Sequence, residues 1–165
     1  MKRLILMRHA KSDWAPPAQP DHDRPLNTRG RHAATAMGNW LRRNGLTPGQ
    51  ILCSSAARTQ ETCARLNLPR TPDLHATLYL AEAADMLRVL HGAHGDTVLM
   101  IGHNPGIAAL AAHLVSAPPD HPRFDDYPTG ATLVAEFDID DWAELTRGTG
   151  RVRHFVIPRD LTDNR

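Results

Sequence analysis

Short apolar runs alternate along the chain with segments whose apolar residues have helical spacing. A short continuous apolar run is typical of a strand that is buried on both faces. Such runs predict strands at residues 4–7, 50–54, 97–102, 132–137 and 152–157, with a weaker extended segment at 74–80. The first of these strands ends directly before Arg8 and His9.

Helices are predicted between the strands. The first begins after a cap at Asn27 or Thr28 and ends at Gly45, which can adopt the left-handed conformation. Further helices are predicted at 55–67 with Ser55 as the N-cap, at 83–90 closed by Gly92, at 106–115 after Asn104 and Pro105, and as a short piece near Trp142.

Two proline-rich segments interrupt this alternation, at 13–25 and 118–128. Proline cannot sustain a helix or a central strand, so both segments are predicted to be loops. A loop as long as the first is unusual, and such loops are often functional.

Alternating strands and helices indicate an α/β protein, here a three-layer α/β/α sandwich with a mostly parallel central sheet. No repeat or linker divides the chain, and 165 residues fit one domain, 1–165. Ligands of such sheets bind at the carboxyl ends of the strands. Arg8, His9, Arg58 and His103 are all expected at that edge.

Charge and composition argue against several classes of function. Nineteen Lys and Arg against eighteen Asp and Glu give a net charge of +1, which predicts no nucleic-acid or membrane binding. The first residues do not resemble an export signal, and no long apolar run occurs. Cys53 and Cys63 lack zinc-site spacing and are interpreted as buried core residues. We expect a cytoplasmic monomer without metal or cofactor.

Two arginines and two histidines at one sheet edge point to phosphoryl chemistry. Guanidinium groups match phosphate oxygens, and a rigidly held neutral imidazole can attack phosphorus. His9 is therefore the candidate nucleophile, with Arg8, Arg58 and His103 stabilising the transferred group. His91 and His94 have the spacing of a metal pair but no third ligand nearby, and are interpreted as a solvated turn. No role is assigned to His22, His32, His75, His113, His121 or His154.

Four ordered blocks carry a resemblance: RHA at 8–10, DRPLNTRG at 23–30, SSAARTQET at 54–62 and GHNPG at 102–106. The chain resembles the histidine phosphatase superfamily, which has the phosphoglycerate mutase-like fold, and within it the short SixA-like phosphohistidine phosphatases. The resemblance implies that His9 accepts the phosphoryl group and that Arg8, Arg58 and His103 form the phosphate pocket. It places Arg24 at the edge of that pocket.

The chain also departs from other branches of the superfamily. Ala10 and residues 11–14 replace the RHG and following asparagine of the sugar-phosphate enzymes, which favours the SixA-like group over a mutase. Asn104 replaces the aspartate of the acid phosphatase branch. Glu82 and Asp85 are both candidate proton donors by resemblance. A weak or absent acid would favour phosphohistidine as substrate, because an imidazole leaving group needs less protonation than an alkoxide.

The sequence thus predicts a metal-independent hydrolase that forms a covalent phosphohistidine intermediate and acts on protein phosphohistidine. An open pocket able to admit a phosphorylated protein is expected from the short chain. One alternative is a small-molecule phosphomonoesterase acting on sugar phosphates or nucleotides. Another is a non-catalytic module that binds phosphorylated partners.

Overall fold

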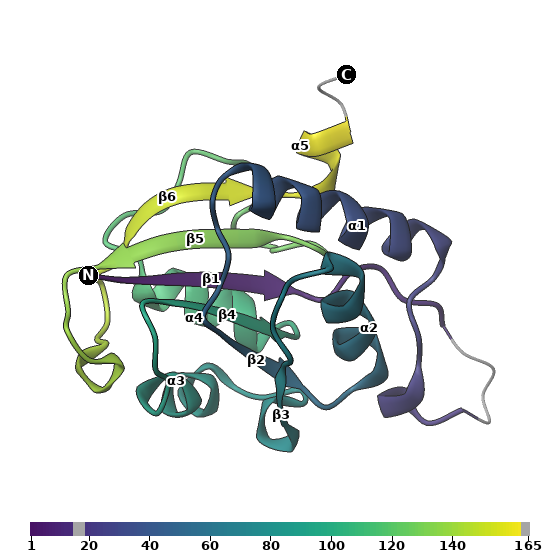
Figure 1. Cartoon of the computed structure of the whole chain (residues 1–165), viewed down its shortest axis with the longest axis horizontal. Coiled ribbons are helices and arrows are strands. Elements are labelled where there is room, and N and C mark those ends of the chain that lie inside the picture. Colours follow the sequence, from purple (N-terminus) through teal and green to yellow (C-terminus); the bar gives the residue numbers. More distant parts are fainter. Residues whose placement is uncertain (15–18, 163–165) are drawn as a thin grey trace.

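The computed structural model describes residues 1–14 and 19–162. A sheet of six strands forms its centre. The strand order is β3-β2-β4-β1-β5-β6. The strands are β1 (Lys2–Arg8), β2 (Gln50–Ser54), β3 (Asp73–His75), β4 (Thr97–Gly102), β5 (Thr132–Phe137) and β6 (Arg151–Val156) (Figure 1).

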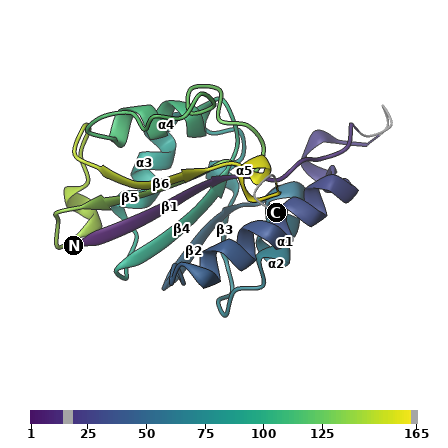
Figure 2. The same cartoon turned by 90° about the horizontal axis from the view of Figure 1, so that it is seen from above.

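Helices cover both faces of this sheet. Figure 2 shows α3 and α4 on one face and α1 and α2 on the other. The α-helices are α1 (Thr28–Arg43), α2 (Ala57–Leu66), α3 (Ala83–His91), α4 (Gly106–Leu114) and α5 (Pro158–Thr162), with 3-10 turns at η1 (Asp21–Asp23), η2 (Ala76–Leu78) and η3 (Trp142–Glu144). The predicted three-layer α/β/α sandwich is confirmed.

The side chains of β1 alternate between the two layers. Leu4 and Leu6 pack into the cluster that holds the α3 and α4 side chains, whereas Ile5 and Met7 pack with α1 and α2. All four are fully buried. Because both faces are covered, the run is continuously apolar, as expected for an interior strand.

The pairing of β1 with β4 sets the position of the functional side chains. The two strands are parallel, and Arg8 lies opposite Gly102 in their register. The residues that follow, His9 and His103, therefore leave the sheet side by side. The strands β1 to β4 are mutually parallel, while β5 pairs antiparallel with β1 and β6 antiparallel with β5.

The helix ends agree with the sequence in most places. Asn27 caps α1, its side chain accepting a hydrogen bond from the Gly30 amide at 2.8 Å. Gly92 follows α3 as predicted. Ser55 does not cap α2, which begins at Ala57 after Ala56. The Ser55 hydroxyl lies 2.9 Å from a ring nitrogen of His22 instead.

The extended segment predicted at 74–80 is shorter in the structure. Only β3 is extended, because it pairs with just the last three residues of β2, and the chain then turns into η2. Leu80 follows with a left-handed φ of 49°. Of the loop predicted at 13–25, residues 15–18 lie outside the described residues, and the remainder includes η1. None of the described helices has the length and apolar character needed to cross a membrane.

Candidate active site

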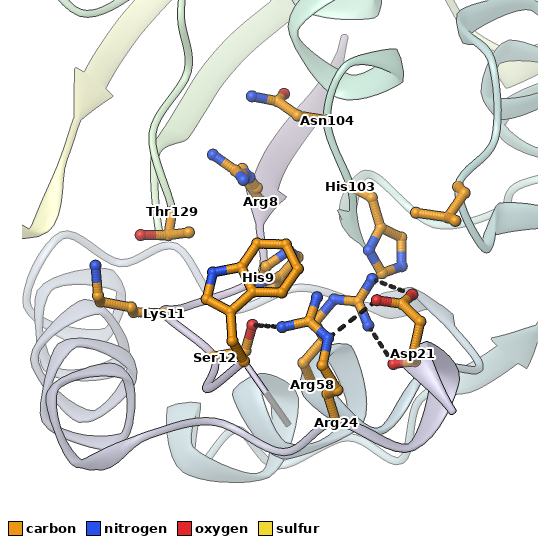
Figure 3. Close-up of a pocket in the computed structure, with 12 residues that line it drawn as sticks. Arg8, His9, Lys11, Ser12, Asp21, Arg24, Arg58, His103, Asn104 and Thr129 are labelled. Atoms are coloured by element: carbon orange, nitrogen blue, oxygen red, sulfur yellow. Dashed lines mark hydrogen bonds and ion pairs between the residues drawn. The ribbon is translucent and has the colours of Figure 1, made fainter. Parts of the chain in front are cut away.

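Separate segments of the chain converge on one hollow of about 360 Å³ at the carboxyl edge of the sheet (Figure 3). Arg8 ends β1 and His9 follows it, His103 follows β4, and Arg58 lies in the first turn of α2. Arg24, from the loop before α1, lines the same hollow. The other lining residues are Lys11, Ser12, Trp14, Asp21, Leu80, Asn104 and Thr129.

His9 is buried, with 6% of its surface exposed. Its Nδ1 lies 2.7 Å from the Ala10 carbonyl oxygen. Because a carbonyl only accepts, Nδ1 carries the hydrogen, and the neutral ring keeps its lone pair on Nε2. Burial, reinforced by the charges of Arg8 and Arg58, lowers the pKa of His9 to about 3. His9 is therefore a neutral imidazole with an available nucleophilic nitrogen at neutral pH.

His103 lies beside it, with the two ring centroids 5.3 Å apart. Its Nε2 is 2.8 Å from Ser54 Oγ. Ser54 Oγ accepts a hydrogen bond from the Ala56 amide. We assign its own proton to the bond with His103, in which Nε2 is then the acceptor. In the neutral ring the hydrogen then sits on Nδ1, which is buried and has no partner among the described residues. This N–H is available to an acceptor in the hollow.

The pKa of His103 is also lowered, to about 3. Burial is the main cause, followed by the neighbouring His9 and the charge of Arg58. Both histidines are thus held neutral, one with a free lone pair and the other with a free N–H.

Asp21 holds the cations of the hollow in place. The buried guanidinium of Arg58 donates to the Asp21 carbonyl oxygen at 2.9 Å and to its carboxylate at 3.1 Å. Arg24 Nε donates to the same carboxylate at 3.0 Å, and the Tyr79 hydroxyl also donates to it. The Tyr79 bond and the two arginines hold the pKa of Asp21 well below its usual range. Asp21 is consequently an ionised acceptor (Figure 3).

Arg8 and Arg58 each keep an unused donor. The Nε of each is buried without a partner among the described residues, although Arg8 also donates to the Tyr127 carbonyl oxygen at 3.2 Å. Burial and the nearby Arg58 lower the pKa of Arg8. Two close cations and unused donors favour an anion between them, and phosphate matches guanidinium geometry well.

The two candidate proton donors lie outside this hollow. Glu82 is exposed at the N-cap of α3 and makes no side-chain cap bond. Asp85 pairs with Arg88 at 2.6 Å and lines a different cavity. Leu80 is the residue of this segment that reaches the hollow, because the chain bends away from it at the start of α3.

The two cysteines interpreted as core residues lie in the core. Cys53 and Cys63 are buried, and burial raises the pKa of their thiols to about 12 and about 11. Of the two histidines interpreted as a solvated turn, His94 is exposed, whereas His91 is half-buried at the end of α3, with Nε2 2.9 Å from the Leu145 carbonyl oxygen. In the described part of the chain no cluster of three or more His, Cys, Asp or Glu residues could hold a metal ion.

Comparison with known proteins identifies the family. Residues 4–84 match the family model of the histidine phosphatase superfamily, branch 1. A solved structure from Nakamurella multipartitia that bears the SixA name is 31% identical, covers 95% of this chain and 96% of its own, and superposes with a TM-score of 0.84. The chain belongs to the histidine phosphatase superfamily.

Other relatives agree with this assignment. The phosphohistidine phosphatase SixA of Escherichia coli is 30% identical over 120 residues, which cover 68% of this chain and 73% of SixA. An uncharacterised protein of Mycobacterium tuberculosis is 32% identical over 160 residues and is matched over its whole length. Membership of the histidine phosphatase superfamily and the SixA-like fold support phosphatase activity.

Three residues of this histidine phosphatase site were not predicted from the sequence. Asp21 and Tyr79 come from loop segments, and only the folded chain brings them to Arg58. Ser54 was interpreted as the end of a strand, and its bond to His103 arises because β2 and β4 are neighbours in the sheet. The adjacent His22, to which no role was assigned, packs edge-on against the Tyr79 ring at 4.8 Å.

Proposed function

We propose that this protein is a phosphohistidine phosphatase that transfers the phosphoryl group to His9 and then to water. The supporting geometry is the neutral His9 with Nε2 free, surrounded by the unused donors of Arg8, Arg58 and His103. Such donors stabilise the charge on the phosphoryl oxygens as it passes between nucleophile and leaving group.

The observation that supports the substrate assignment is the ionisation state of the carboxyl group in the hollow. Asp21 is the one carboxyl group among the described residues that line it, and its low pKa keeps it ionised. An alkoxide leaving group would need a proton at the scissile oxygen, which an ionised carboxylate cannot supply. Phosphohistidine takes up its proton from solvent on the far ring nitrogen, so its imidazole departs neutral without a local acid.

The first step forms a covalent intermediate. The lone pair of His9 Nε2 attacks phosphorus in line, the phosphorus–nitrogen bond of the substrate breaks, and its electron pair stays on the departing imidazole. His9 keeps its Nδ1 hydrogen bonded to the Ala10 carbonyl oxygen. The second step is attack by water, which releases phosphate and returns the electron pair to Nε2. Because Nδ1 remains protonated, His9 leaves as a neutral imidazole.

The decisive comparison uses two peptides of identical sequence, one carrying phosphohistidine and the other phosphoserine. A general acid contributes about 10²- to 10⁴-fold, so kcat/KM should favour phosphohistidine by at least about 100-fold. Comparable rates on phosphoserine or on a sugar phosphate would overturn the substrate assignment and indicate a phosphomonoesterase.

Three variants complete this test. Glu82→Gln and Asp85→Asn should leave phosphohistidine turnover unchanged, since neither side chain lines the hollow. His9→Ala should abolish turnover while the circular dichroism spectrum stays that of the wild type. Binding of the phosphopeptide by the wild type without any phosphate release would identify a binding module and exclude a phosphatase.

A further inference from the structure

A second hollow, of about 300 Å³, adjoins the candidate active site. The two hollows share Lys11 and Thr129, which lie to one side of His9, away from Asp21 and His103 (Figure 3). Among the described residues, four cationic side chains and no carboxylate line the second hollow. The four are Lys11, Arg29, Arg123 and Arg159. We call the hollow that these four residues line the basic hollow. In a chain with a net charge of +1, this is a local concentration of positive charge.

Among the cationic residues of the basic hollow, Arg29 is the one whose position is hardest to explain as a contribution to the stability of the fold. It lies in the first turn of α1, where the helix dipole disfavours a cation, and that turn contains no acidic residue. Its side chain is exposed and makes no hydrogen bond or ion pair with any described residue. Lys11 is likewise exposed, whereas Arg123 is paired with Asp126 at 2.8 Å. Arg29 and Lys11 are thus available to an acidic ligand.

The basic hollow differs from the active site in how its cations are held. Arg58 and His103 are buried and present unpartnered polar atoms, which suits a tightly held phosphoryl group. No unpartnered buried atom of the described residues belongs to the lining of the basic hollow. Long exposed cations suit carboxylates on the surface of a macromolecule, because they adjust to several positions at little desolvation cost.

The rim of the active site also suits a large substrate. Trp14 is 89% exposed and Leu80 is 53% exposed, and both line the hollow that holds His9. Exposed apolar side chains around a binding site are typical of a surface that a protein partner covers. A small phosphorylated metabolite inside the hollow would leave most of this surface in water.

We propose that the basic hollow binds acidic side chains close to the phosphohistidine of the substrate protein. This inference rests on the proposed function and adds a sequence preference to it. Phosphohistidine enters the active site, and carboxylates beside it contact Arg29 and Lys11. Electrostatic complementarity of this kind raises the rate of association and selects among partners.

The test compares two phosphohistidine peptides that differ only in flanking residues, glutamate in one and glutamine in the other. At low ionic strength the kcat/KM of the wild type should be about fivefold higher for the glutamate peptide than for the glutamine peptide. The difference should arise from a lower KM for the glutamate peptide. Added salt at about 0.5 M should remove the preference, because it screens exposed charges. Equal kcat/KM for both peptides at low ionic strength would overturn the proposal.

Arg29→Glu should reverse this preference, and it has a matched control on the same helix. Arg43 is exposed in the last turn of α1, at the other end, and does not line the basic hollow. Arg43→Glu makes the same charge change and should keep the wild-type preference. The melting temperature of Arg29→Glu should be equal to or above that of the wild type, since the change suits the helix dipole. An equal loss of preference in both variants would indicate a general charge effect and contradict the proposal.

Three further measurements distinguish this inference from the proposed function and from a second phosphoryl subsite. Turnover of ammonium phosphoramidate reports the chemistry alone and should be the same in Arg29→Glu and wild type. Binding of both peptides to His9→Ala reports docking without turnover and should show the same preference for glutamate, which would support docking even if hydrolysis failed. Competitive inhibition by inorganic pyrophosphate that Arg29→Glu relieves would instead indicate a second phosphoryl subsite and refute the proposal.

Discussion

Asp21 connects most of the charged groups of the site. It accepts hydrogen bonds from Arg24, Arg58 and Tyr79, and its main chain accepts a further bond from Arg58. A carboxylate in this position lowers the repulsion between the arginines and fixes their planes before an anion binds. Its role is to position Arg58 and Arg24.

Asp21→Asn should therefore weaken substrate binding more than it slows chemistry. The amide keeps the shape but loses the charge, so Arg58 becomes less ordered. We expect KM for a phosphohistidine peptide to rise about tenfold with a smaller change in kcat, as when one charge-assisted hydrogen bond is weakened. Steady-state kinetics of purified protein provide the measurement.

Asp23→Asn is the control for this variant. Asp23 lies in the same 3-10 turn, and its exposed carboxylate pairs with no described residue other than His22, at 3.7 Å. Its kinetics should match the wild type. An unchanged KM in Asp21→Asn, or an equal effect of both substitutions, would show that Asp21 does not position the arginines.

At the residue scale, the sequence predicted the side chains that follow strands and missed those that depend on loop contacts. Arg8, His9 and His103 could be placed at the site because each stands at the carboxyl end of a buried strand. Asp21 could not, because two of its three side-chain partners, Arg58 and Tyr79, lie 37 and 58 residues away and its own segment has no periodic pattern. Glu82 was predicted from resemblance alone, and the fold leaves it exposed.

At the scale of elements, the packing of α1 supports the turn that carries His9. Gly30, in the first turn of α1, lies against the Lys11 backbone, and a Cβ atom there would stand 1.9 Å from the Lys11 carbonyl oxygen. The backbone N–H of Asn27 donates to the same oxygen at 3.0 Å. The Ala10 amide donates to Thr62 of α2 at 3.0 Å. The turn after β1 is thus attached to both helices of this face.

Gly30→Ala should shift this turn and harm both stability and activity. The added methyl group meets main chain rather than a flexible side chain, so α1 or the turn must move. Overpacking of this kind costs about 1–3 kcal/mol of unfolding free energy. We expect that loss in urea denaturation, together with a lower kcat.

Gly49→Ala serves as the comparison, because the nearest atom to its added Cβ would be 3.8 Å away. It should retain full activity and nearly full stability. Wild-type stability and kcat in Gly30→Ala would show that α1 does not support the turn.

The sequence predicted most elements because their patterns are local. The bounds of β2, β4 and β5 match the predicted strands residue for residue. The start of α2 and the end of the 74–80 segment were wrong for a common reason. In both places the outcome depends on tertiary contacts, the Ser55 bond to His22 and the short pairing of β3 with β2.

At the scale of the whole molecule, the buried histidines link stability to pH. The pKa values of His9 and His103 are about 3 in the folded protein, against about 6.5 for a histidine in an unfolded chain. Between these values the unfolded chain binds more protons than the folded one. Stability is therefore full above pH 6.5 and falls as the pH falls towards 3.

Acidification from pH 7 to pH 5 should cost about 2 kcal/mol of unfolding free energy for each of the two histidines. The measurement is urea denaturation of the wild type and of His9→Gln at several pH values. The variant should show a smaller dependence of stability on pH. His32→Gln, which removes an exposed histidine, is the control and should retain the wild-type dependence. An unchanged pH dependence in His9→Gln would contradict the assignment of His9 as a buried neutral imidazole.

The architecture of the whole molecule followed from the alternation of strand and helix patterns, which predicted three layers and the edge at which ligands bind. The same alternation predicted a mostly parallel sheet, which β1 to β4 form, but it did not predict that β5 and β6 extend the sheet with antiparallel pairs. The basic hollow was also not predicted, because its cations come from four distant parts of the chain and join only in the folded protein.

The most direct test of the central claim is to trap the phosphoenzyme. A single turnover of a phosphohistidine peptide is quenched in alkaline detergent, and mass spectrometry locates the phosphoryl group. We expect an adduct on His9 that is stable in base, labile in acid and absent from His9→Ala. An acid-stable adduct, an adduct on another residue, or rapid phosphate release by His9→Ala would contradict it.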